Sequence, residues 1–146
     1  MKKKFITFFL LLLFQTIPYQ LFAACNDAPG DGVNYENCQF ADGQDLSGSY
    51  LPNSNLILTS FIKVNFDKSV IMASNLSNGN FAESSFFRAN LYESVLDGGN
   101  FEKANFESSN LIRVSFKGAS LIETNFKNSN LFGADFTGAN ILNANF

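Results

Sequence analysis

The sequence predicts an all-β fold, a four-sided coil over residues 44–146, and three patterns carry the prediction. Every fifth residue from Leu46 to Phe146 is Leu, Phe or Ile, at twenty-one positions without a break. When these core positions are classed as Phe or aliphatic, the classes agree in 14 of 17 pairs four repeats apart, against 6 of 18 pairs three repeats apart. The residue two before each core position is almost always small. Neither a helix nor a flat strand keeps a five-residue period on one face, so the chain must bend once per repeat, with four bends in each 20-residue coil.

Residues 1–24 have the pattern of a secretory signal peptide. Lys2–Lys4 supply a positive start, residues 5–14 form an apolar run, and Ala23-Ala24 offers small residues for cleavage. The alternative is an uncleaved membrane anchor, but ten apolar residues fall well short of the roughly 20 that span a bilayer. We therefore expect an exported protein, either periplasmic or secreted.

Residues 25–43 form a short leader bounded by the two cysteines, Cys25 and Cys38. In an oxidising compartment, two cysteines this close in sequence favour a disulfide. Residues 21–25 also resemble a bacterial lipobox, although Phe22 stands where Leu is usual. Lipidation of Cys25 would anchor the protein in the envelope and would exclude the disulfide, and free thiols are the third possibility.

The repeats of residues 44–146 predict stacked columns of like side chains. One column holds phenylalanine only: Phe66, Phe86, Phe106, Phe126 and Phe146. Asn precedes the core position in twelve repeats, and this residue suits corners because it tolerates turns and bonds to nearby backbone. Gln44 is the one large residue at a small position, which predicts a distorted first side.

The segments Ala104-Asn105-Phe106-Glu107-Ser108 and Ala134-Asp135-Phe136-Thr137-Gly138 resemble the repeat of the pentapeptide repeat family. The resemblance covers residues 44–146 and implies a right-handed quadrilateral parallel β-helix, here of about five coils. The leader at 25–43 resembles a Cys-bounded segment that precedes some exported bacterial members, and it is a candidate N-terminal cap.

Outward positions in this fold predict a stripe of apolar side chains on adjacent coils, formed by Met72, Tyr92, Ile112 and Phe132. Such a stripe is either a partner interface or a chance consequence of tolerant outer positions. A second outward column alternates in charge and predicts a ladder of ion pairs, at Lys63, Glu83, Lys103 and Glu123. The last core residue, Phe146, is a candidate for end-to-end stacking, since an uncovered coil exposes core and strand edges.

The composition argues against catalysis. The chain has no His, which removes the commonest general base and metal ligand, and no phosphate-binding motif or facing pair of acids is evident. We expect no enzyme activity, cofactor or metal, and instead an exported scaffold that binds an unidentified protein or envelope component.

The family resemblance implies one alternative, a DNA mimic that binds a type II topoisomerase. Without Lys2–Lys4 the chain has seven basic and thirteen acidic residues, a net charge of −6. This charge argues against binding nucleic acid, and it is also weak for a mimic of duplex DNA. Membrane association is expected only if Cys25 is lipidated.

Overall fold

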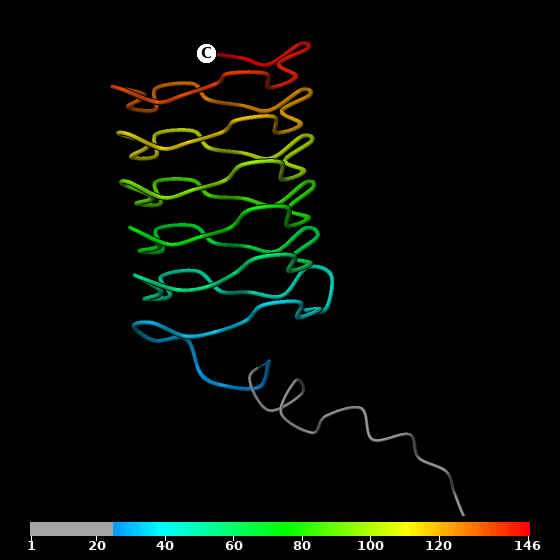
Figure 1. The fold of residues 1–146 in the computed structure, drawn as a ribbon, viewed down its shortest axis with the longest axis vertical. Helices are drawn as coiled ribbons and strands as arrows, with labels where there is room; N and C mark the ends of the chain where they lie inside the picture. The colour runs from blue at the N-terminus through cyan, green and yellow to red at the C-terminus, as the bar shows by residue number, and fades with distance from the viewer. Residues whose placement is uncertain (1–24) are drawn as a thin grey trace, which may run out of the picture.

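The structure, a computed structural model, describes residues 25–146 as a rod of stacked coils (Figure 1). The predicted signal peptide at 1–24 lies outside the described residues. Between residues 25 and 146 the chain contains neither a helix nor a continuous strand. Regular structure consists of isolated parallel β-bridges that run from Asn34 to Asn145.

The bridges define four sides. From Asp45 onward each bridge joins residues 20 apart, and the bridged positions recur every five residues, as in Asp45↔Asn65 and Tyr50↔Val70. From Asp45 onward each coil therefore has four bridging positions and lies in register with the next coil. This confirms the four-sided parallel coil that the 20-residue period predicts.

The first coil is out of register by one residue. Here the bridges span 21 residues, Asn34↔Asn55 and Gln39↔Ser60, so the extra residue falls in the segment 40–44. Phe40 takes the core position and stacks on Phe61 with ring centroids 4.3 Å apart. The distortion expected near Gln44 is thus a one-residue insertion, and the coiled path begins before the expected boundary at residue 44.

Phenylalanine rings stack along the rod axis. In the column from Phe66 to Phe146, successive ring centroids lie 5.0, 4.7, 5.4 and 5.2 Å apart and the rings are nearly parallel. A second column, Phe61, Phe81 and Phe101, stacks in the same way. Rings of neighbouring columns meet edge to face or tilted, both of which are favourable aromatic arrangements. The interior is therefore filled by columns of like side chains.

Each corner is a tight turn whose third residue has positive φ. In the turn that starts at Leu46, the Ser49 N–H donates to the Leu46 carbonyl at 3.2 Å, and Gly48 has φ 66°. Sixteen non-glycine residues take the same left-handed conformation, Leu58 among them. This conformation costs a residue with a Cβ roughly 1–2 kcal/mol, so cross-coil hydrogen bonds and core packing must offset it.

Asn side chains tie the corners together. The Asn105 Oδ1 accepts from the Glu107 N–H at 3.1 Å, which closes the turn. The same Oδ1 accepts from the Asn125 Nδ2 of the next coil at 3.1 Å, and Asn125 in turn accepts from Asn145. Stacked Asn side chains therefore hydrogen-bond from one coil to the next.

Small inward residues carry a second set of cross-coil bonds. The buried Ser94 hydroxyl donates to the Ile71 carbonyl at 2.7 Å and accepts from the Ser74 N–H at 3.2 Å. The hydroxyls of Thr59 and Thr124 likewise donate to backbone carbonyls of the preceding coil. Among the described residues, Ser69 alone has a buried side-chain oxygen without a hydrogen-bond partner.

Ser94→Ala should lower the free energy of unfolding by about 1–3 kcal/mol, because it leaves a buried carbonyl and a buried N–H without partners. Ser69→Ala is the matched control and should change stability by less than about 0.5 kcal/mol or raise it. Alanine fits there, since Ala89 occupies the same position in the next coil. Urea unfolding of both variants tests this, and equal losses would contradict it.

Candidate interaction surface

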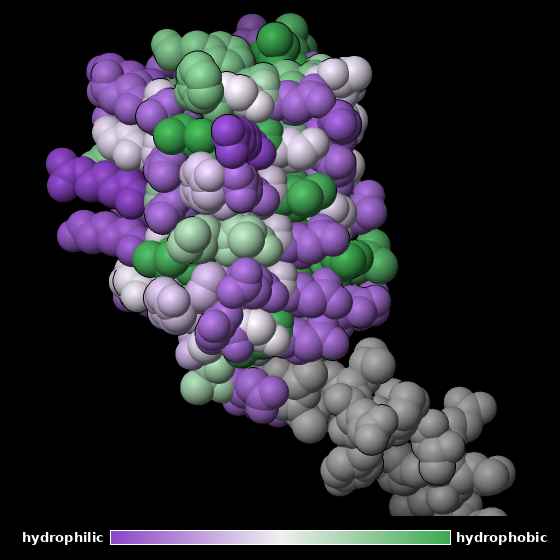
Figure 2. Space-filling model, turned by 60° about the vertical axis from the view of Figure 1, so that its left-hand side comes forward, coloured by the Kyte–Doolittle hydropathy of each residue, from purple (hydrophilic) through white to green (hydrophobic). Residues whose placement is uncertain are grey.

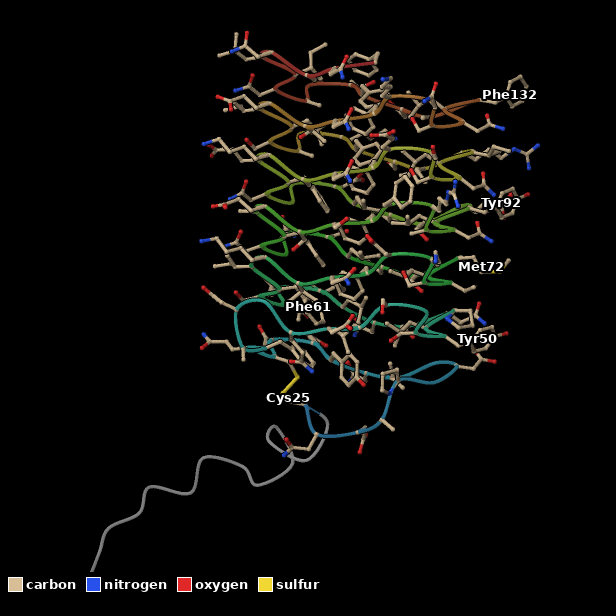
Figure 3. All side chains as sticks on the ribbon, turned by 180° about the vertical axis from the view of Figure 1, so that it is seen from behind. Cys25, Tyr50, Phe61, Met72, Tyr92 and Phe132 are labelled. Atoms are coloured by element: carbon tan, nitrogen blue, oxygen red, sulfur yellow. A yellow bond between two sulfur atoms is a disulfide. The ribbon has the colours of Figure 1, made fainter. Side chains whose placement is uncertain are left out.

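The apolar stripe of Met72, Tyr92, Ile112 and Phe132 lies along one side of the rod (Figure 3). Each residue follows a core residue directly and sits 20 residues from its neighbours in the stripe, so the four occupy successive coils. Phe132 is 75% exposed, whereas the other three are partly exposed. Pro52, one coil earlier in the column, is buried. The structure therefore brings the four predicted residues together, with Phe132 the most prominent.

Sequence reasoning missed Tyr50, which is 56% exposed on the same side of the rod (Figure 3). Tyr50 lies in a column of bridging positions that continues with Val70, Asn90, Asn110 and Asn130. The sequence signal that could have revealed Tyr50 is an aromatic residue in a column that is otherwise rich in Asn. Tyr50 stands directly before a core residue, whereas each stripe residue stands directly after one. The column that predicts the stripe therefore does not include Tyr50.

An ion pair flanks Tyr92. Arg113 Nη1 lies 3.0 Å from Glu93 Oε1. Glu93 directly follows Tyr92 in the chain, and Arg113 directly follows the next stripe residue, Ile112. The interaction of the Tyr92 hydroxyl with the Glu93 carboxylate is the main cause that raises the pKa of Tyr92 and lowers that of Glu93. The ring therefore lies beside an ion pair that carries no net charge.

The charge ladder forms only in part. Lys63 Nζ lies 3.8 Å from Glu83, but Lys103 pairs with Glu102, at 3.9 Å, instead of with a residue of its own column. These side chains are about half exposed, and such pairs contribute at most about 1 kcal/mol each. This column therefore acts as a solvated face.

Another side carries a polar network around Asp135. Asp135 Oδ1 accepts from both the N–H and the hydroxyl of Thr137, at 2.9 and 2.6 Å, and Lys117 Nζ lies 3.2 Å from Oδ2. The two hydrogen bonds from Thr137, then the one from Lys117, lower the Asp135 pKa from 3.8 to about 2. The carboxylate thus takes the capping role that Asn plays at other corners.

Thr137→Val should raise the pKa of Asp135 from about 2 toward 3.8, because it removes the hydroxyl donor. A lowered folded-state pKa stabilises the fold above the ordinary value, and this contribution is lost as the pH falls from 3.8 to about 2. Carboxyl-carbon NMR titration measures the shift. Thr137→Ser keeps the donor and should leave the low pKa in place; an unchanged pKa in the valine variant would contradict the assignment.

At the N-terminal end, Cys25 and Cys38 form a disulfide with Cα atoms 5.5 Å apart. Cys38 is buried, and the buried Tyr35 beside it donates its hydroxyl to the Asp27 carbonyl at 2.6 Å. The leader and the first coil line an open pocket of about 740 Å³. Its lining includes Tyr35, Phe40, Gln44 and Leu46.

The last coil is more open than the coils beneath it. Phe146, the candidate for end stacking, is 58% exposed, and Ile141 and Leu142 are exposed as well. Phe126, one coil below Phe146 in the same column, is buried. Hydrophobic side chains are visible at this end of the rod (Figure 2).

Within residues 25–146, no group of His, Cys, Asp and Glu side chains is arranged to hold a metal ion. The same part of the chain has no helix with the length and hydropathy needed to cross a membrane.

Comparison with protein families gives two matches. Residues 69–146 match the model described as a pentapeptide repeat region, and residues 45–78 match the model described as pentapeptide repeats (8 copies). No curated protein matches the sequence.

Several solved structures are similar to this chain. The pentapeptide repeat protein Rfr23 of the cyanobacterium Cyanothece 51142 is 21% identical with a TM-score of 0.50, covering 80% of this chain and 86% of its own. A trypsin-treated variant of QnrB1, a plasmid-mediated fluoroquinolone resistance protein, is 20% identical with a TM-score of 0.47, over 78% of this chain. A pentapeptide repeat protein from the Arabidopsis thaliana thylakoid lumen is 26% identical with a TM-score of 0.46, over 73% of this chain.

This chain spans 63% of the length of the QnrB1 chain and 63% of that of the Arabidopsis protein. The similarity to Rfr23 concerns the fold alone. Pentapeptide repeat proteins form right-handed quadrilateral β-helices, which agrees with the four-sided parallel coil described above.

Proposed function

The chain belongs to the pentapeptide repeat family, and from this premise we propose that it is a non-enzymatic scaffold, exported to the cell envelope, that binds a partner along its apolar stripe. Pentapeptide repeat proteins are in general structural or binding proteins. The binding role assigned to this chain is our proposal.

The observation that carries the proposal is the stripe itself. Four apolar side chains on successive coils share one side of the rod, and Phe132 projects from it into solvent. On the face seen in Figure 2, hydrophobic residues lie in separate patches among hydrophilic ones. Exposed apolar surface that is arranged in order, and not scattered singly, is typical of an interaction site.

Two features support export. Residues 1–24 have the charge and hydropathy pattern of a secretory signal. The Cys25–Cys38 disulfide is suited to an oxidising compartment outside the cytosol. Fractionation of cells followed by the intact mass of the mature protein tests this point, and a cytosolic protein that retains residues 1–23 would overturn it.

The binding role is tested by a pull-down from solubilised envelope with the double variant Tyr92→Asp, Phe132→Asp. We expect it to lose partners that the wild-type protein retains. Leu58→Asp is the matched control, because Leu58 is 53% exposed but lies outside the stripe. If the double variant retains every partner, the stripe is not the binding surface.

The DNA-mimic alternative receives little support from the charges. Three of the outward acids are paired with bases, in Lys63–Glu83, Arg113–Glu93 and Lys117–Asp135. A mimic of duplex DNA needs rows of unpaired negative charge, since phosphates carry one charge about every 1.7 Å. We expect no effect of the protein on DNA supercoiling by gyrase, and inhibition would revive this alternative.

End-to-end association of the described chain is a separate proposal. The exposed Phe146, Ile141 and Leu142 form an apolar surface on the last coil. Light scattering of the mature protein should then show dimers that Phe146→Asp converts to monomers. A wild-type monomer at high concentration would contradict it.

A further inference from the structure

Aromatic side chains occur at every second coil on the side that carries the stripe, with Tyr50 and Phe132 exposed and Tyr92 partly exposed. Tyr50 bridges Val70, which bridges Asn90, so Tyr50 lies two coils before the coil of Tyr92. Phe132 lies a further two coils along. Neighbouring parallel segments lie about 4.8 Å apart, so aromatic rings recur roughly every 10 Å along the rod axis. Met72 (Figure 3) occupies the coil between Tyr50 and Tyr92. Ile112, 20 residues from both Tyr92 and Phe132, occupies the coil between those two.

We propose that this aromatic track, Tyr50, Tyr92 and Phe132, binds a linear, uncharged β-1,4-linked glycan that runs along the rod. The inference rests on the proposed function, because it names the partner class of the same surface. In an extended β-1,4-linked chain every second sugar presents the same face, and the disaccharide repeat matches the two-coil spacing of the rings. The apolar C–H face of a sugar packs on an aromatic ring, whose polar edge can still meet solvent.

The charges beside the track favour a neutral ligand. Glu93 and Arg113 pair at 3.0 Å, so the two charges beside the Tyr92 ring neutralise each other. The column of bridging positions beside the stripe continues as Asn90, Asn110 and Asn130, whose side chains are amides. The Asn110 Nδ2 donates to the Asn90 Oδ1 at 3.0 Å, which orients these two amides along the rod axis. Amide groups in such a row are suited to sugar hydroxyls.

The width of the surface favours a narrow ligand over a globular protein. A standard protein interface covers about 800 Å² on each partner. The stripe is one residue wide, and three of its four members are only partly exposed. A single glycan chain fits a track of this shape, whereas a folded partner would need surface on both sides of it.

Isothermal titration of the mature protein with cellohexaose and chitohexaose tests the inference, with α-linked maltohexaose as the control ligand. We expect binding of at least one β-linked hexasaccharide and none of maltohexaose. Tyr92→Ala and Phe132→Ala should each weaken binding about two- to tenfold, the effect of one aromatic contact. Tyr92→Phe should retain binding, and so should Leu58→Ala, which removes an exposed apolar side chain from another part of the surface.

A variant with altered ring spacing tests whether binding depends on the two-coil spacing of the rings or only on their apolar character. Phe132→Ala combined with Ile112→Phe keeps three aromatic rings but places two of them on adjacent coils, so binding should stay as weak as in Phe132→Ala alone. Full recovery would overturn the inference, as would binding of neither β-linked sugar. If no sugar binds while the Tyr92→Asp, Phe132→Asp variant still loses an envelope partner, the glycan inference fails and the proposed function stands. If that variant loses no partner, the proposed function fails.

Discussion

Phe106→Ala is expected to lower the free energy of unfolding by about 3–5 kcal/mol, the usual cost of removing a buried aromatic ring. The Phe106 ring is fully buried and stacks between Phe86 and Phe126, at 4.7 and 5.4 Å. Its loss leaves a void between two columns that rigid stacked coils cannot close. Urea unfolding followed by circular dichroism measures the change.

The matched control is Phe146→Ala, in the same column. Phe146 stacks on Phe126 at 5.2 Å but is 58% exposed, so its removal should cost less than half as much. Equal losses at the two positions would show that position within the stack does not determine the contribution of a ring.

Cys38→Ser should lower the free energy of unfolding by about 2–5 kcal/mol, because the disulfide no longer restrains the unfolded chain and a buried position gains a hydroxyl. The disulfide closes a separation of 13 residues and holds the leader against the first coil. Thermal unfolding of the wild-type protein with and without reductant, beside Cys38→Ser, measures this. The reductant should destabilise the wild-type protein and leave the variant unchanged.

The same protein preparation tests the alternative fate of Cys25. A disulfide-bonded chain has an intact mass 2 Da below that of the reduced chain, whereas a lipidated chain would be heavier by its acyl groups and insensitive to reductant. Lipid on Cys25 would contradict the disulfide and place the protein on a membrane.

Much of the fold follows from the sequence because the repeat is nearly perfect. The five-residue period specifies where the chain bends, and the recurrence of Phe and aliphatic positions at 20 residues specifies which side chains stack. The bridges 20 residues apart and the ring stacks confirm both. The Asn ladder could also be expected, since an amide can serve its own turn and the next coil at once.

The first coil was not predictable in the same way. Phe40 lies six residues before Leu46, so it falls outside a strict five-residue series although it occupies a core position. A corner loop can absorb one extra residue, here within residues 40–44, without moving the core column. A fixed five-residue period therefore reveals a coil only when no residue is inserted into that coil.

Two adjacent glycines have different roles. Gly98 lies at a corner, with φ 65°. Gly99 instead occupies an inward position, where an added Cβ would lie 2.6 Å from the Phe101 ring. The tilt of the ring decides this contact, and the sequence does not specify the tilt.

The stripe was predicted as a column, but its exposure was not. The sequence places Met72, Tyr92, Ile112 and Phe132 at equivalent positions, whereas the structure exposes Phe132 far more than the others. Phe132 lies near the C-terminal end of the described chain, where neighbouring side chains are exposed as well. The exposure of a stripe residue depends on its neighbours in space, which the repeat pattern does not specify.

The central claim is that one 20-residue coil is the structural unit, and deletion variants test it most directly. Removing residues 87–106 deletes one full coil and joins Phe86 to Glu107, so every column continues in register. Removing residues 87–105 deletes one residue fewer and shifts all later side chains between core and surface. Urea unfolding should show a cooperative transition for the first variant, with a smaller m-value because less surface is buried, and no folded state of comparable stability for the second. Equal stability of the two variants would contradict the four-sided coil.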